Sequence, residues 1–244
     1  LDNLETAAMR VNRGTIVPLP ASSGTVYAFG NFALGLSILF PDYEAYKGEV
    51  KASSNVISYM NYQDQSLWVG GTFALNVSDQ DALGLTMYYT SRTFQRSVTD
   101  QLTQSSSVLL TTEEKAFSQN SVIYILGYYH QWNKNWSSGI SSRLPSLPVD
   151  GQGSYFQSII DTSSSITVPI NRKNIHADTR IPPRVNGGIA YTQSGKGTLS
   201  LELTYHGHEA YTDMDDPEAG ERIKHREIWN AALGGEYYLS SGLA

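Results

Sequence analysis

The sequence predicts an all-β protein, an antiparallel up-and-down transmembrane β-barrel, and three observations support this prediction. In residues 66–92, apolar side chains alternate with small or polar ones at a period of two on both sides of a short polar turn. Successive strand residues point to opposite faces, so this segment forms a hairpin with one apolar face. Each arm has the roughly 9–11 residues that a tilted strand needs to cross a bilayer core. The third observation is that this pattern recurs along the chain.

The alternation in this hairpin assigns one face to lipid. The apolar face carries Leu67, Val69, Phe73, Leu75 and Val77 in the first arm and Leu83, Leu85, Met87 and Tyr89 in the second. The opposite face carries smaller or polar residues, among them Gly70, Thr72, Gly84 and Thr86.

The rest of the chain repeats this unit after an irregular lead-in. We expect no regular structure in residues 1–22, where Pro18 and Pro20 would interrupt a strand. The alternation predicts two strands in residues 25–40, around a tight turn at Gly30–Asn31. Further strands are predicted in the ranges 121–144, 185–206 and 227–239.

The connections between the predicted strands are alternately short and long. Short turns are expected near positions 30, 79, 134, 195 and 240. Polar connections, read as exposed loops, occupy residues 41–65, 97–118, 145–183 and 207–226. Outer-membrane barrels have this layout, with short periplasmic turns and long extracellular loops.

The predicted strands number about nine, in a single domain that spans residues 1–244. Single-chain bacterial barrels have even strand numbers and close so that no edge remains. We therefore expect an internal fragment of a larger barrel, truncated at both ends. The same alternation also occurs in soluble sandwiches and soluble barrels, but these rarely carry long loops at one end only.

Composition narrows the possible functions. A net charge of −6 argues against a nucleic-acid partner, which would require clustered Lys and Arg. The chain has no Cys, so disulfides and thiolate metal sites are excluded. His206 and His208 lack a convincing third ligand, and no nucleophile motif is present. We expect no metal, no cofactor and no enzymatic activity.

Several charged side chains fall on the face opposite the lipid in the predicted register. Buried charges need partners or water, so these groups either pair across the lumen or face water inside it. In both cases they determine which solutes the passage admits. The alternative is that they only pair with one another and hold the wall rigid. The candidates are Arg92, Arg96, Arg143, Glu202, His206, Arg226 and Glu236.

Two segments resemble the outer-membrane transporters of hydrophobic compounds and long-chain fatty acids, the FadL/TodX type. The first contains a "GLS…PD" step formed by Gly35, Leu36, Ser37, Pro41 and Asp42, followed by a hairpin with Gly70, Ala74, Leu83, Gly84, Leu85 and Tyr88. The second, residues 182–206, is similar to a late hairpin of that family. The resemblance covers about two thirds of the chain, but the N-terminal plug of the family and its Asn-Pro-Ala-Gly segment have no counterpart here.

The resemblance implies a monomeric barrel in the bacterial outer membrane, with the lipid bilayer and a small hydrophobic solute as its partners. The expected function is passage of solutes such as fatty acids or aromatic hydrocarbons. The alternative is a structural or adhesive surface barrel whose long loops bind a partner.

Overall fold

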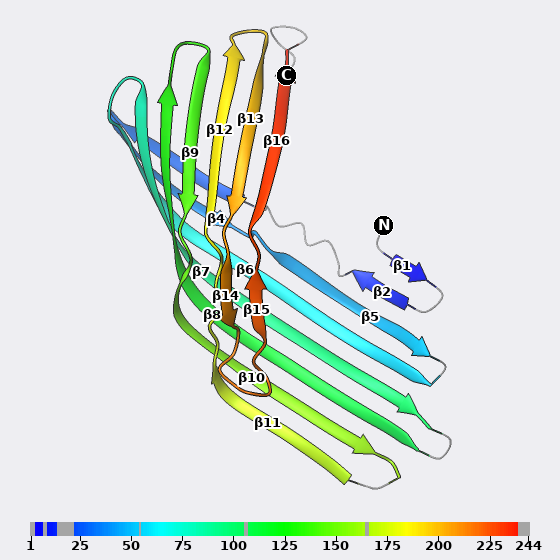
Figure 1. Cartoon of the computed structure of the whole chain (residues 1–244). Helices are drawn as coiled ribbons and strands as arrows, with labels where there is room; N and C mark the ends of the chain where they lie inside the picture. Colours follow the sequence, from blue (N-terminus) through cyan, green and yellow to red (C-terminus); the bar gives the residue numbers. More distant parts are fainter. Residues whose placement is uncertain are drawn as a thin grey trace.

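The computed structural model describes residues 3–6, 9–13, 22–53, 55–104, 107–163 and 166–238, and the regular structure in these ranges is entirely β (Figure 1). No helix in the described part of the chain is long and apolar enough to cross a bilayer. The strands are β1 (Asn3–Thr6), β2 (Met9–Arg13), β3 (Ser22–Phe29), β4 (Phe32–Leu39), β5 (Tyr43–Ser53), β6 (Val56–Asn76), β7 (Asp81–Thr103), β8 (Val108–Gln131), β9 (Trp136–Arg143), β10 (Leu147–Asp161), β11 (Ile166–His176), β12 (Arg184–Gln193), β13 (Gly197–His206), β14 (Glu209–Thr212), β15 (Arg222–His225) and β16 (Ile228–Tyr237).

Nine of these strands form a continuous antiparallel meander, which we call the membrane wall. Its order is β3, β4, β6, β7, β8, β9, β12, β13 and β16, and each strand pairs with the next one in this order. These are the strands that the alternation predicts. The turns predicted near 30, 79, 134 and 195 are confirmed, and Gly30 has the positive φ of 60° that its tight turn requires. The turn expected near 240 lies outside the described residues.

The predicted long loops are wrong. Residues 41–65, 97–118 and 145–183 consist largely of strands, which extend the same sheet beyond the wall. We call this part of it the distal sheet: it contains β1, β2, β5, β10, β11 and the far halves of β6, β7 and β8. The physical reason is that backbone pairing continues past the lipid boundary, where neither face has to be apolar. Thr-rich and Ser-rich strands therefore resemble loops in composition.

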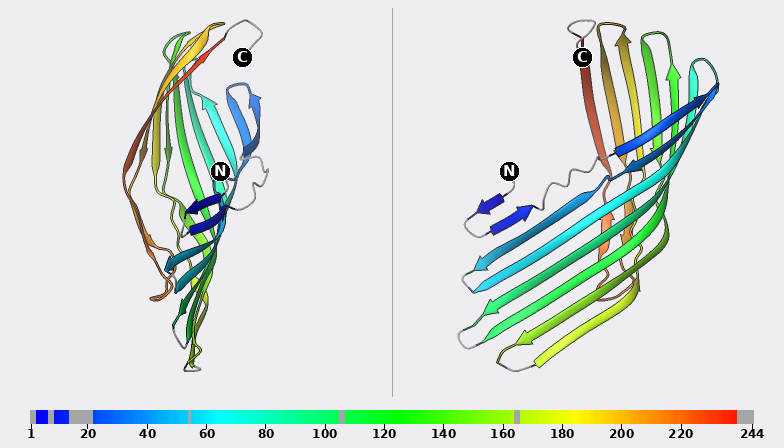
Figure 2. Two further views of the ribbon diagram at one scale, coloured as in Figure 1. Left: turned by 90° about the vertical axis from the view of Figure 1, so that its right-hand side faces the viewer. Right: turned by 180° about the vertical axis from the view of Figure 1, so that it is seen from behind.

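Two further expectations are corrected. The part of the lead-in 1–22 that the structure describes is not irregular, because β1 pairs with β2 and β2 pairs with β5. The acidic segment 207–226 contains a hairpin, in which β14 pairs with β15 as a separate two-stranded sheet. In Figure 1 this hairpin lies in front of the diagonal strands, and from behind those strands cover it (Figure 2).

The two faces of the membrane wall differ as predicted. On the outer face Met87 is 50% exposed, whereas its neighbour Tyr88 on the inner face is only 8% exposed. Tyr88 packs with Trp68 and Ile123 in a buried cluster on the inner face. The apolar side chains exposed on the outer face are those that would meet lipid.

The outer face also shows where the lipid region ends. Along β7 its side chains are apolar from Leu83 to Tyr89 and polar from Ser91 onward. On β8 the change occurs between Val122 and Asn120, which are the register partners of Tyr89 and Ser91. The boundary is therefore a row that runs across neighbouring strands. It leaves about nine residues of each strand in the apolar belt, the length that crosses a bilayer core.

The wall is strongly curved but does not close within the described residues (Figure 2). There β3 pairs only with β4, and β16 pairs only with β13. The structure thus confirms the predicted fold class, an all-β antiparallel barrel wall, which stays open within the described residues.

Candidate functional site

A large cavity lies on the inner face where the membrane wall meets the distal sheet. Its volume is about 720 Å³. The inner faces of β6, β7 and β8 form one side. The segment 178–183, which connects β11 to β12, and the β14–β15 hairpin line it as well. The site therefore depends on how these two segments are held against the sheet.

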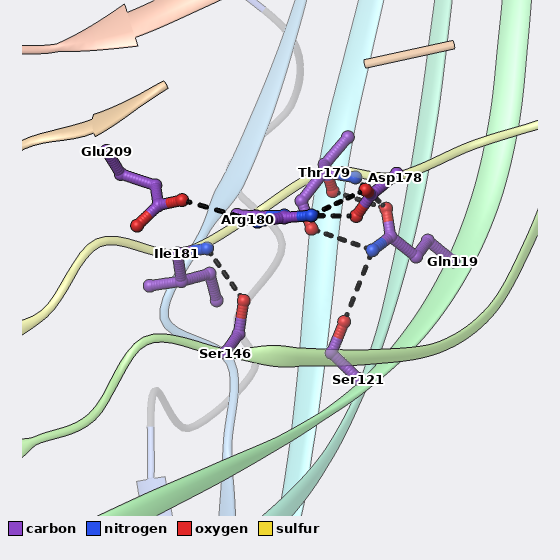
Figure 3. A network of polar contacts seen from close by, with 8 residues as sticks. All are labelled: Gln119, Ser121, Ser146, Asp178, Thr179, Arg180, Ile181 and Glu209. Carbon is purple, nitrogen blue, oxygen red and sulfur yellow. Dashed lines mark hydrogen bonds and ion pairs between the residues drawn. The ribbon is translucent and has the colours of Figure 1, made fainter. Parts of the chain in front are cut away.

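The connecting segment is fixed by a buried glutamine, shown in Figure 3. Gln119 on β8 accepts hydrogen bonds from the backbone N–H and the Oγ1 of Thr179, at 2.6 and 2.5 Å. Its Nε2 donates to the Thr179 carbonyl at 2.7 Å. At the other end Ile181 N–H donates to Ser146 Oγ at 2.8 Å. Because Gln119 is only 2% exposed, these bonds replace the water that it would otherwise require.

The β14–β15 hairpin is anchored by a small core in the distal sheet. Met214, at its tip, is fully buried against Phe117 and Tyr155. Glycines in β10 make this close approach possible: a Cβ at Gly153 would collide with Met214 Cε, and one at Gly151 would collide with the backbone of Ala177.

A buried ion pair adds to this anchor. Lys115 Nζ on β8 lies 2.7 Å from Asp213 Oδ2, and their side chains are 2% and 9% exposed. Breaking a pair of this kind leaves one uncompensated charge in a dry environment. The hairpin is therefore a fixed wall of the cavity.

Aromatic rings run across the inner face of the distal sheet and lead into the cavity. Tyr46 stacks on Tyr62 with the ring centroids 4.5 Å apart, and Tyr62 meets the edge of Phe94 at 5.4 Å. Phe94 in turn stacks on Phe117 at 4.8 Å. Burial, reinforced by the carboxylate of Asp64, raises the pKa of Tyr62 to about 12, so this phenol stays neutral at physiological pH. The series offers an apolar ring surface to a solute.

Ion pairs neutralise most arginines of the cavity. Arg92 donates from Nε and Nη2 to the two oxygens of Asp64, at 2.9 and 2.6 Å, in a bidentate pair. Arg96 Nη2 lies 2.7 Å from Glu113 and 2.9 Å from Glu221 on the β14–β15 hairpin.

The structure brings three of the seven predicted site residues together. Arg92, Arg96 and Arg143 all line the cavity. Glu202 lies apart, in a second hollow of about 510 Å³ on the inner face of the wall. His206 is partly buried on β13, beside its register partner Arg184 on β12.

The other two predicted residues are not part of this arrangement. Arg226 is exposed in the connection between β15 and β16, and Glu236 is exposed near the end of β16. In the described ranges, no three His, Asp or Glu side chains converge in a way that could hold a metal ion. A role for any of the seven residues in passage stays a prediction.

Sequence reasoning missed several residues that shape the cavity. Tyr62 and Asp64 belong to the predicted loop 41–65, and yet with Ser66 they continue the inner face of β6 beyond Trp68. Extending the period of two beyond the apolar residues would have found them. For Asp213 the sequence carries no comparable signal, because only the docking of the β14–β15 hairpin against β8 brings it here.

Comparisons with known proteins support the fold. No protein-family model matches the chain, and no curated protein matches its sequence. Among solved structures, the toluene transporter TbuX of Ralstonia pickettii aligns with a TM-score of 0.63 at 12% identity, over 96% of this chain and 70% of that one. The monoaromatic hydrocarbon channel CymD gives a TM-score of 0.59 at 12% identity, over 96% and 69%.

A third solved structure agrees with these two. The toluene transporter TodX of Pseudomonas putida gives a TM-score of 0.52 at 10% identity, over 90% of this chain and 69% of that one. At these identities the likeness establishes the fold. The chain thus has the fold of the FadL/TodX type of outer-membrane hydrocarbon transporter, as its sequence predicts.

Proposed function

We propose that the protein is a channel that passes small hydrophobic solutes across the bacterial outer membrane, without a chemical step. The observation that carries this proposal is the cavity of about 720 Å³ on the inner face. It lies at the level of the lipid boundary, and the aromatic series that ends at Phe94 and Phe117 leads into it. Its volume is in the range of small-molecule sites, and aromatic rings such as Trp68, Phe94 and Phe117 line it among polar and charged side chains.

The fold adds independent support, because solved structures that share it are named as transporters or channels for toluene and monoaromatic hydrocarbons. We further propose that the protein works as a monomer, with the short turns in the periplasm and the distal sheet outside the cell. In this arrangement the inward-facing charged residues, Arg92, Arg96, Arg143 and Glu202 among them, influence which solutes pass.

Uptake measurements test the transport proposal. Cells that lack other hydrocarbon channels should take up labelled toluene faster when they make this protein. Uptake of a hydrophilic sugar of similar size should change little. Replacing Phe94 with Asp should slow toluene uptake, since it places a charge in the aromatic series; Tyr43→Asp, on an exposed residue outside the cavity, is the matched control. If toluene enters equally with and without the protein, the channel proposal is wrong, and the surface-binding alternative takes its place.

Single-cysteine labelling tests the orientation, and the chain offers a clean background because it has no Cys. Gln104→Cys lies at an exposed tip of the distal sheet, and Asp79→Cys lies in a short turn. A membrane-impermeant maleimide added to intact cells should label the first variant and not the second. The opposite result would reverse the topology.

A further inference from the structure

The cavity contains two arginines without a carboxylate partner. Arg143 at the end of β9 and Arg184 at the start of β12 are direct register partners. Like charges placed opposite each other across strands destabilise a sheet. Within the described part of the chain neither arginine forms an ion pair, whereas Arg92, Arg96 and Arg180 in the same cavity are all paired.

The groups near this pair compensate its charge only in part. Arg143 Nη2 donates only to the Pro182 carbonyl, at 3.0 Å. Asp42 attracts Arg143 electrostatically but forms no ion pair with it, and one of its oxygens accepts a hydrogen bond from Ser66 Oγ at 3.1 Å. The next register partner in the row, His206, supplies no negative charge.

Both arginines and a neighbouring tryptophan also have buried donors within the protein wall of the cavity. The Nε atoms of Arg143 and Arg184 and the indole Nε1 of Trp68 are all buried and have no hydrogen-bond partner. All three side chains line the cavity. Buried N–H donors without an acceptor are costly, and a carboxylate is the group whose two oxygens match an arginine best.

An apolar surface adjoins the two arginines. Ile125 is the register partner of Arg143, and Ile181 directly precedes the Pro182 that Arg143 contacts. Both isoleucines pack against the buried cluster of Trp68, Tyr88 and Ile123. The rings of Trp68 and Tyr88 lie 5.7 Å apart in a tilted arrangement. Cationic donors and aromatic rings are thus contiguous in one cavity.

We propose that this part of the cavity is a binding site for an aromatic carboxylate. Arg143 and Arg184 hold the carboxylate, and the ring lies against Trp68 and Ile181, which line the same cavity. The proposal rests on the proposed channel function and extends its solutes from neutral aromatic compounds to aromatic anions. The ligand neutralises two opposed cations that form no ion pair within the described part of the chain.

Calorimetric titration of the purified protein in detergent tests the site. Benzoate should bind, acetate should bind much more weakly because it has no ring, and added salt should weaken benzoate binding. Arg143→Gln and Arg184→Gln should each lower benzoate affinity by roughly tenfold or more, the usual effect of losing a hydrogen bond to a charged group. Arg172→Gln is the matched control, because Arg172 does not line this cavity and pairs with Glu218.

Each outcome supports or overturns the proposed carboxylate site. Equal affinity for benzoate and acetate would indicate a site for free anions and overturn the proposal, as would unchanged benzoate binding in both variants. If the variants do not fold, the salt dependence in the unmodified protein decides: salt-independent binding overturns the proposal. Toluene uptake into cells separates the two claims, because uptake of toluene without benzoate binding refutes only this site, and absence of toluene uptake refutes the channel itself.

Discussion

The membrane wall and the distal sheet are built from the same central strands but are stabilised differently. In the wall, the outer face is a belt of exposed apolar side chains such as Leu85 and Leu201, and its stability depends on lipid. In the distal sheet, side chains of opposite charge meet on the inner face, as in the pair of Lys115 and Asp213. The difference follows from the solvent: hydrocarbon tolerates only apolar side chains, whereas water allows charges to be paired and partly buried.

The largest effect should come from the distal sheet. Asp213→Ala removes the close partner of buried Lys115 and leaves only Glu221, 3.9 Å away, as a counter-charge, and we expect a loss of about 3 kcal/mol in unfolding free energy. Urea unfolding in lipid vesicles measures it. The double variant Lys115→Met with Asp213→Leu removes both charges and should recover most of the loss. If the single variant is as stable as the double variant, the ion pair does not anchor the hairpin.

The stability of the wall should fall when a charge is placed on its outer face, but much less when the charge is placed on its inner face. Leu201→Arg places a cation in the lipid belt and should lower stability by about 2–4 kcal/mol, since Leu201 lies near the middle of β13. Ser200→Arg, on the opposite face, should have a much smaller effect. Equal losses in the two variants, measured by the same unfolding experiment, would mean that the lipid face is misassigned.

The smallest expected effect is a pH dependence of the stability of the β14–β15 hairpin. Hydrogen bonds from the backbone N–H groups of Ala219 and Glu218, together with Arg172, hold the pKa of Asp216 below its ordinary value. A depressed pKa contributes stability that is present above the unfolded-state pKa and is lost as the pH falls through the folded-state pKa.

Thermal unfolding of the native protein and of Asp216→Asn measures this contribution. The difference between them should be present at about pH 6 and should disappear toward about pH 2. A constant difference over this range would show that the hydrogen bonds do not depend on the charge of Asp216.

The sequence predicts the membrane wall well and the distal sheet poorly, for one physical reason. Lipid imposes a strict period of two on residues such as Leu83, Leu85 and Met87, so their strands and their lipid face can be deduced. Beyond Ser91 no apolar face is required, and the strands lose this signal although their pairing continues. The cavity was predicted in part: Arg92 and Arg143 were found through alternation, whereas the contribution of Gln119 depends on a segment about 60 residues away.

The unbroken length of β6, β7 and β8 has a consequence for assembly of the protein in a cell. These strands have 21, 23 and 24 residues, and only about nine of each lie in the apolar belt. With the turns in the periplasm, every charged residue of the distal sheet has to traverse the bilayer before the strands reach their final depth. Unpaired charges and unpaired backbone groups cannot rest in hydrocarbon. Pairs such as Lys115 with Asp213 join β8 to a hairpin far along the chain, so the cavity is complete only when the β14–β15 hairpin has docked on the distal sheet.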